Sequence, residues 1–176
     1  MRILTFLTIP FLFFGCLGMP DSVSPVGDFE LEKYLGKWYE IARLDHSFER
    51  GLDNVSAEYS LRKNGSVKVL NRGYSHSKKK WEEAVGKAKF ARNADQGYLK
   101  VSFFGPFYGS YVIFELDQEN YNYAFVSGPD TTYLWLLSRD PSPDREIIDK
   151  FRKKAGELGF DTESLIFVKQ NLNGGK

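Results

Sequence analysis

A series of short strand-like runs, separated by turn signals, constrains the fold of this chain more than any other feature. Eight such runs follow one another without an intervening helical pattern. They cover residues 38–44, 55–61, 67–69, 85–90, 98–104, 110–116, 121–127 and 133–138. In the second run Val55, Ala57 and Tyr59 alternate with polar residues, as in a strand with one buried face. The pattern predicts a sheet of consecutive antiparallel strands.

The connections between these runs are short and contain strong turn residues. Asn64-Gly65, which follows the second run, is a typical hairpin sequence, and Gly105-Pro106 and Gly128-Pro129 interrupt the later ones. An up-and-down sheet of eight strands closes into a barrel, because closure removes its exposed edges. Eight strands leave space inside for side chains or one small ligand. We therefore predict an all-β fold, an eight-stranded up-and-down antiparallel barrel.

After Arg139 the hydrophobic period changes to that of a helix. Ser142 is a suitable N-cap and Pro143 a suitable first helical residue, and Gly159 can end the helix in the left-handed conformation. The apolar stripe between them predicts one helix packed outside the barrel; it consists of Ile147, Ile148, Phe151, Ala155 and Leu158. Residues 165–170 alternate again and predict a short final strand.

The first fifteen residues have the pattern of a secretory signal peptide. Arg2 precedes an apolar stretch at residues 3–14, which is shorter than the about 20 residues that cross a bilayer. The single cysteine, Cys16, follows this stretch and excludes an internal disulfide and a cysteine-based zinc site. We expect cleavage before Cys16 and lipidation of this residue, as at a bacterial lipobox. The alternative is ordinary cleavage that leaves a free thiol.

The segment after the cysteine is rich in glycine, proline and serine, which is typical of a linker. The expected organisation is therefore a signal peptide at residues 1–15, a lipidated cysteine and tether at 16–28, and the barrel domain at 29–172.

Composition narrows the function. With 24 Lys+Arg and 23 Asp+Glu the net charge is +1, which argues against a nucleic-acid binder. Aromatic residues reach 16%, which suits strands and the walls of an apolar cavity. The sequence contains no recognised nucleophile, phosphate-binding or zinc-protease motif, so we expect no enzyme activity, no metal and no cofactor.

Three short motifs mark one end of the expected barrel. Gly36 and Trp38 open the first strand, Asp117 begins the turn before the seventh, and Arg139 ends the eighth. This arrangement resembles the lipocalin family. Antiparallel order brings these residues to the same end, where a guanidinium over an indole contributes roughly 0.5–2 kcal/mol. We interpret them as a structural plug that closes the barrel.

Longer segments are similar to the bacterial outer-membrane branch of that family, which is related to apolipoprotein D. They include residues 38–43, 48–51, 100–109 and 133–139, and the resemblance extends from about residue 29 to residue 170. It implies a lipoprotein anchored in the outer membrane by its acyl group and facing the periplasm. It also implies that the barrel binds a fatty acid or a lysophospholipid, for storage or transport in the cell envelope.

Strand alternation, with the family register for the sixth and eighth strands, predicts which side chains face the ligand. The expected ligand-binding residues are Ala57, Tyr59, Ala88, Phe90, Val101, Phe103, Tyr111, Ile113, Tyr133 and Trp135. We place the loops around residues 46–53 and 105–107 at the mouth of the barrel.

Several residues allow two interpretations. Lys78, Lys79 and Lys80 form either a solvated hairpin tip or a site for anionic lipid head groups. Glu40 and Glu115 are expected to point inward near the closed end, either as partners of Arg139 or of water, or as an acid–base pair.

The two histidines, His46 and His76, are expected on the surface. Two alternative functions stay open: an enzyme acting on a lipophilic substrate, and an envelope protein with a filled barrel. The latter would associate, for example as a homodimer, through exposed rings such as Phe104 and Phe107.

Overall fold

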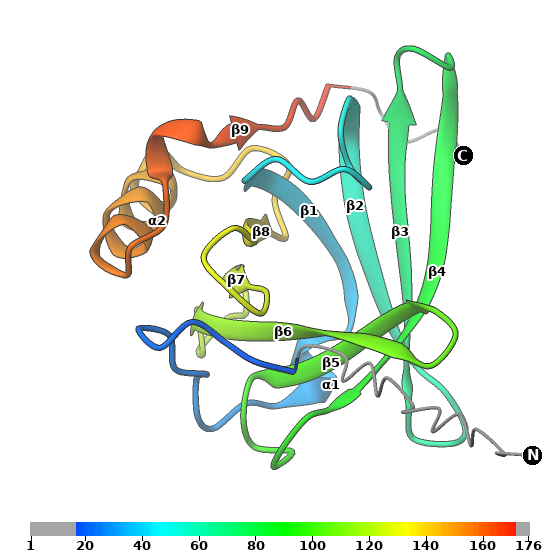
Figure 1. Ribbon diagram of the computed structural model, residues 1–176, viewed down its shortest axis with the longest axis vertical. Coiled ribbons are helices and arrows are strands. Elements are labelled where there is room, and N and C mark those ends of the chain that lie inside the picture. Colours follow the sequence, from blue (N-terminus) through cyan, green and yellow to red (C-terminus); the bar gives the residue numbers. More distant parts are fainter. Residues whose placement is uncertain (1–16, 172–176) are drawn as a thin grey trace, which may run out of the picture.

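Nine strands form one antiparallel sheet that closes on itself, in the computed structural model that describes residues 17–171 (Figure 1). Strands β1 to β8 pair in sequence order, and β1 also pairs with β8, which closes the barrel. The strands are β1 (Gly36–Arg43), β2 (Leu52–Leu61), β3 (Val67–Ser75), β4 (Lys80–Phe90), β5 (Tyr98–Phe104), β6 (Phe107–Leu116), β7 (Tyr123–Ser127), β8 (Leu134–Ser138) and β9 (Ile166–Phe167). The predicted eight-stranded barrel is confirmed, with β9 added outside on β1.

The β2–β3 connection has the expected turn chemistry. Gly65 has a φ of +76°, a conformation that glycine adopts without strain, and its N–H donates to the Arg62 carbonyl at 2.9 Å. The Asn64 side chain accepts the N–H of Ser66 at 3.1 Å. This turn lies at the closed end of the barrel, because β1 starts at that end and β2 returns to it.

A helical turn and an arginine plug this closed end. Helix α1 (Leu31–Tyr34) precedes β1, and the indole N–H of buried Trp38 donates to the Tyr34 carbonyl at 2.8 Å. The Arg139 guanidinium carbon lies 3.9 Å from the Trp38 ring centroid. Gly36 has a φ of +92°, and a Cβ there would lie 3.4 Å from the Arg139 side chain. The sequence motif thus forms a compact stack in which a larger residue at position 36 would be strained.

Arg139 also joins the segments that meet at this end. Its guanidinium donates to the carbonyls of Lys37, Lys33 and Leu35 at 2.8, 2.8 and 2.9 Å. A longer bond of 3.3 Å reaches the Tyr121 carbonyl in the β6–β7 turn.

Asp117 organises the β6–β7 turn. Its carboxylate accepts the backbone N–H groups of Asn120 and Asn122 at 3.2 and 3.3 Å, and its carbonyl accepts the Tyr121 N–H at 2.7 Å. Tyr121 itself has a φ of +55° and is buried. Strand β7 therefore begins at Tyr123, two residues later than the alternation predicts.

The predicted outer helix is present as α2 (Arg145–Glu157), which lies beside the barrel in Figure 1. Phe151 and Ala155 are fully buried, and the Phe151 ring packs edge-on against Phe125 of β7 at 5.0 Å. The predicted start was wrong: the N-cap is Asp144 and not Ser142, because the Ser142 N–H donates to the Asp140 carboxylate in a preceding turn.

Residues 17–28, predicted as a tether, pack along the outside of the barrel. The Val26 N–H donates to the Ile113 carbonyl and the Val26 carbonyl accepts the Gly97 N–H, both at 2.9 Å. Val23 is buried in the cluster between α2 and the barrel wall. The predicted signal peptide and Cys16 lie outside the described residues.

The C-terminal part adds η1 (Thr162–Ser164) and β9, and β9 is shorter than the strand predicted at residues 165–170. Among residues 17–171, no helix has the length and apolar character needed to span a bilayer.

Candidate functional site

The barrel encloses a cavity of about 300 Å³ at its open half. This volume lies at the lower end of the range for small-molecule pockets. The cavity is lined by Glu40, Phe48, Glu49, Val55, Ser56, Ala57, Tyr59, Val69, Asn71, Val101, Phe103, Gly109, Ser110, Tyr111, Gly128, Pro129, Tyr133, Trp135 and Leu137. Most of these side chains are apolar or aromatic, so the cavity suits an apolar ligand with a polar group.

A row of three tyrosine hydroxyls lies between the cavity and the plugged end. Tyr111 bonds to Tyr34 at 2.7 Å on one side and to Tyr59 at 2.8 Å on the other. Burial raises the pKa of all three phenols, so they remain protonated. Tyr59 and Tyr111 line the cavity, whereas Tyr34 packs on Trp38 below it with ring centroids 4.7 Å apart.

Most of the residues predicted to bind ligand line this cavity. They are Ala57, Tyr59, Val101, Phe103, Tyr111, Tyr133 and Trp135. Ala88, Phe90 and Ile113 are not among the lining residues. Ala88 and Ile113 are fully buried, and the Phe90 ring packs edge-on against Phe29 with centroids 6.2 Å apart. Alternation identified the inner face, but it does not indicate how far along the strand the packed core ends.

Two carboxylates and an arginine form a buried cluster in the cavity wall. The Arg43 guanidinium donates to Glu40 at 2.6 Å and to the Glu49 carbonyl at 2.9 Å. Burial raises the pKa of Glu40 well above its usual range, the nearby Glu49 charge adds to this, and burial also raises the pKa of Glu49. The pair therefore favours a shared proton over two charges.

Sequence analysis missed this cluster because it depends on an irregularity in β1. Residues three apart on a regular strand point to opposite faces, but the β1–β8 register shifts between Glu40 and Ala42. The shift allows Arg43 to meet Glu40, whose predicted partner was Arg139. The prediction for Glu115 was also wrong: it points outward and binds Lys150 and Lys154 of α2, because β6 has a register shift between Ile113 and Glu115.

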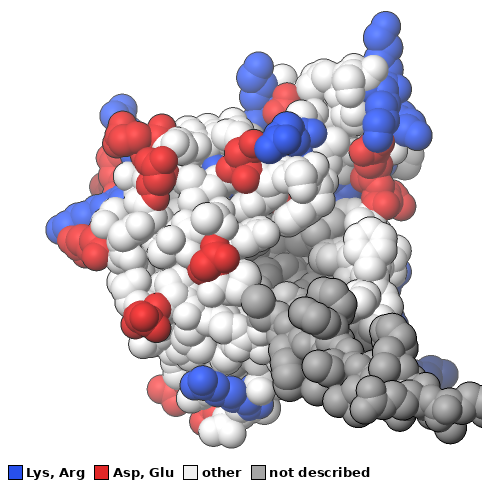
Figure 2. Space-filling view, viewed as in Figure 1, with Lys and Arg blue, Asp and Glu red and all other residues white. Residues whose placement is uncertain are grey.

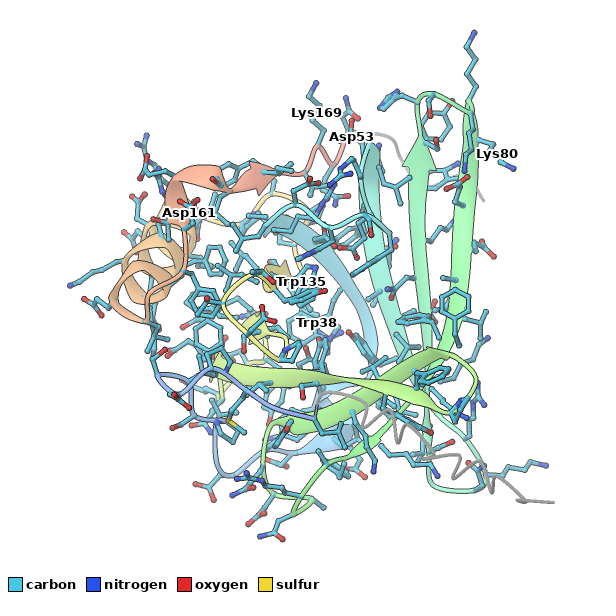
Figure 3. All side chains as sticks on the ribbon, viewed as in Figure 1. Trp38, Asp53, Lys80, Trp135, Asp161 and Lys169 are labelled. Carbon is cyan, nitrogen blue, oxygen red and sulfur yellow. The ribbon has the colours of Figure 1, made fainter. Side chains whose placement is uncertain are left out.

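Trp135 lies in the interior, near the mouth, and joins the charged cluster to an aromatic stack (Figure 3). Its indole N–H donates to the Glu49 carboxylate at 3.0 Å. His46 stacks on Tyr133 and Phe48, with ring centroids 4.8 and 5.3 Å apart, and lies 4.8 Å from Trp135.

The prediction that His46 is on the surface was therefore wrong: only 5% of it is exposed. Burial, together with the Arg43 charge, lowers its pKa to about 4. His76 is exposed as expected and lies 2.8 Å from Asp53.

A closed antiparallel barrel with one plugged end and a hollow, largely apolar interior defines a β-barrel protein with an internal small-molecule site. The chain belongs to the lipocalin family, since the model of the lipocalin-like domain matches residues 29–170.

Relatives extend the similarity over nearly the whole chain. It is 64% identical over 170 residues to the outer membrane lipoprotein Blc of Vibrio cholerae, covering 97% of this chain and 99% of the relative. It is 46% identical to Blc of Escherichia coli strain K12, covering 93% of each. The protein is accordingly a lipid-anchored lipocalin of the outer membrane.

Among solved structures, insecticyanin from the tobacco hornworm Manduca sexta matches with a TM-score of 0.69 and 26% identity, covering 86% of each chain. This match supports the barrel architecture.

Proposed function

We propose that this protein binds a fatty acid or a lysophospholipid in its barrel, and stores or transports it in the cell envelope. The observation that carries the proposal is the apolar cavity of about 300 Å³ behind Trp135. Each methylene buried there contributes roughly 0.8 kcal/mol, before the losses of ordering and of competition with a membrane.

The charges of the cavity wall favour one orientation of the ligand. Within the described part of the chain, Glu40 and Glu49 are the charged side chains that line the cavity, and Arg43 is already bonded to Glu40. An anionic head group inside would meet carboxylates without a free cation, which is costly in a buried site. The acyl chain therefore enters first and the head group stays at the mouth.

Tryptophan fluorescence tests the proposal directly. We expect palmitate or a lysophospholipid to change the emission of the wild type, and the change to disappear in Trp135→Phe while binding is retained. A ligand that binds by an independent measurement without altering the Trp135 contribution would show that the site is elsewhere.

A matched pair of variants on β2 tests whether the cavity itself is needed. Ala57→Phe places a ring in the cavity, whereas Ser60→Phe places the same ring on the exposed face of the strand. We expect the first variant to lose at least about tenfold in affinity, or about 1.4 kcal/mol, and the second to bind as the wild type does. Equal binding by both would contradict the proposed site.

The geometry of the cavity also bears on the two alternative functions, an envelope protein with a filled barrel and an enzyme acting on a lipophilic substrate. An open cavity argues against a filled barrel. A catalytic role would rest on Glu40 and Glu49, the carboxylates that face the cavity, since Glu115 points outward. Loss of turnover of a lipophilic substrate in Glu49→Gln, with binding retained, would support that alternative.

A further inference from the structure

The first described residues lie on the outer wall of the barrel and reach the β7–β8 connection at its mouth. The Tyr98 hydroxyl donates to the Leu17 carbonyl at 3.0 Å. A Cβ on Gly18 would lie 3.6 Å from the carbonyl oxygen of Pro129, which lines the cavity. Leu17, the first described residue, follows the predicted lipidation site directly in the sequence. A lipid anchor at that site would hold the described fold near a bilayer.

Three phenylalanine rings are exposed around the same mouth. Phe104 and Phe107 face each other at the tip of the β5–β6 hairpin and are 82% and 61% exposed. Phe48, in the β1–β2 loop, is 61% exposed and lines the cavity opening. Rings exposed to water bury no apolar surface, whereas rings at the boundary between lipid head groups and acyl chains do bury it, which favours binding to the bilayer.

The β3–β4 hairpin adds positive charge to this end. Lys78, Lys79 and Lys80 form its tip, and Figure 2 shows lysine and arginine side chains gathered at the top right, where Figure 1 places this hairpin. Lys78 is paired with Glu82 at 2.7 Å. Among the described residues no ion pair engages Lys79 or Lys80. Free lysines near an anionic lipid surface attract it, and each contributes measurably to binding.

The pairing of β4 with β5 determines how far the lysine tip extends past the hairpin that carries Phe104 and Phe107. β4 pairs with β5 only from Lys87 to Phe90, so residues 80–86 project past the end of that pairing. At about 3.3 Å per residue, Lys80 at the lysine tip lies roughly 23 Å beyond Lys87, the last residue of that pairing. In Figure 1 the outer edge of β4 and the β5–β6 hairpin bound the same side of the molecule. A barrel that leans toward this side brings Phe104, Phe107 and the lysines toward one plane.

We propose that this mouth surface, defined by Phe48, Phe104, Phe107 and Lys78 to Lys80, docks on an anionic lipid bilayer, so that the cavity opens toward the membrane. The mouth then faces the bilayer, so an acyl chain could pass between the bilayer and the cavity in either direction. The docking itself does not depend on which ligand the cavity holds.

Amide hydrogen exchange of the mature, lipidated protein tests the proposal. The protein is reconstituted in vesicles of phosphatidylcholine alone and in vesicles that also contain phosphatidylglycerol. We expect residues 76–80 and 103–108 to exchange roughly tenfold more slowly in the anionic vesicles. Residues 62–66, in the β2–β3 turn at the plugged end, serve as the internal control and should not change.

Two variants and one control separate the contributions. Lys79→Glu with Lys80→Glu, and Phe104→Ser with Phe107→Ser, should each return both mouth segments to the faster exchange. Lys63→Glu with Lys153→Glu changes the same charge at exposed positions outside the mouth surface and should leave the protection intact.

Equal exchange in both kinds of vesicle would overturn the proposal. Slower exchange of the mouth segments that appears in detergent without vesicles, and increases with protein concentration, would also overturn the proposal. In that case a second copy of the chain would cover the rings. Ala57→Phe distinguishes docking from cavity binding, because it should leave the mouth protection unchanged even where ligand binding is lost.

Discussion

Replacing Arg139 by methionine tests how much the plug contributes to stability. Methionine can still pack on the Trp38 ring, but it leaves three backbone carbonyls at 2.8–2.9 Å without their donor. Each of these bonds contributes about 1 kcal/mol net at a partly exposed site, and the cation–π contact about another 1. We therefore expect Arg139→Met to lower the free energy of unfolding by about 4 kcal/mol.

Urea unfolding at pH 7, followed by far-ultraviolet circular dichroism, measures this loss. Arg139→Lys keeps the charge but cannot span the same carbonyls, so it should lose about half as much. Arg152→Met is the control, since Arg152 makes one exposed contact with Glu163 at 3.4 Å and should cost less than about 0.5 kcal/mol. A loss below about 1 kcal/mol in Arg139→Met, with an unchanged urea slope, would refute the structural role of the guanidinium.

Three further predictions concern groups whose surroundings the fold determines. The pKa of His46 is lowered to about 4, so between pH 6.5 and 4 the imidazole takes up a proton only in the unfolded chain. The free energy of unfolding should therefore fall by up to about 3 kcal/mol as the pH is lowered across this window. Urea titrations should show a smaller fall for His46→Phe. Burial alone would raise the pKa of Glu115, but hydrogen bonds from two α2 lysines outweigh burial and lower that pKa. The contribution of Glu115 to the free energy of unfolding is therefore present above about pH 4.5 and lost as the pH falls. In thermal melts Glu115→Gln should cost about 1 kcal/mol at pH 7 and almost nothing at pH 3. Tyr111→Phe removes the central hydroxyl of the row between Tyr34 and Tyr59 and should lower the free energy of unfolding by about 2 kcal/mol, whereas an unchanged urea midpoint would show that water replaces it.

The repeated strand pattern, the turn residues and the final helical stripe were enough to predict the barrel and its outer helix. These signals are local, because alternation and turn geometry depend on a few neighbouring residues. The motif residues Gly36, Trp38 and Arg139 could be placed at one end from strand order alone. Alternation also identified Ala57 and Tyr59 as inward-facing residues, whereas Trp135 was placed inward by the register of the family that the sequence resembles.

Only the tertiary structure decided the polar part of the cavity and the course of the N-terminal segment. Register shifts in β1 and β6 move Glu40 beside Arg43 and turn Glu115 toward α2, and a shift of this kind leaves no mark in the hydrophobic period. His46 is buried because its loop folds back on Trp135, a contact between residues far apart in the chain. Residues 17–28 look like a linker, yet they pack on the barrel because Ile113 of β6 and Gly97, which precedes β5, offer backbone partners that no local sequence pattern reveals.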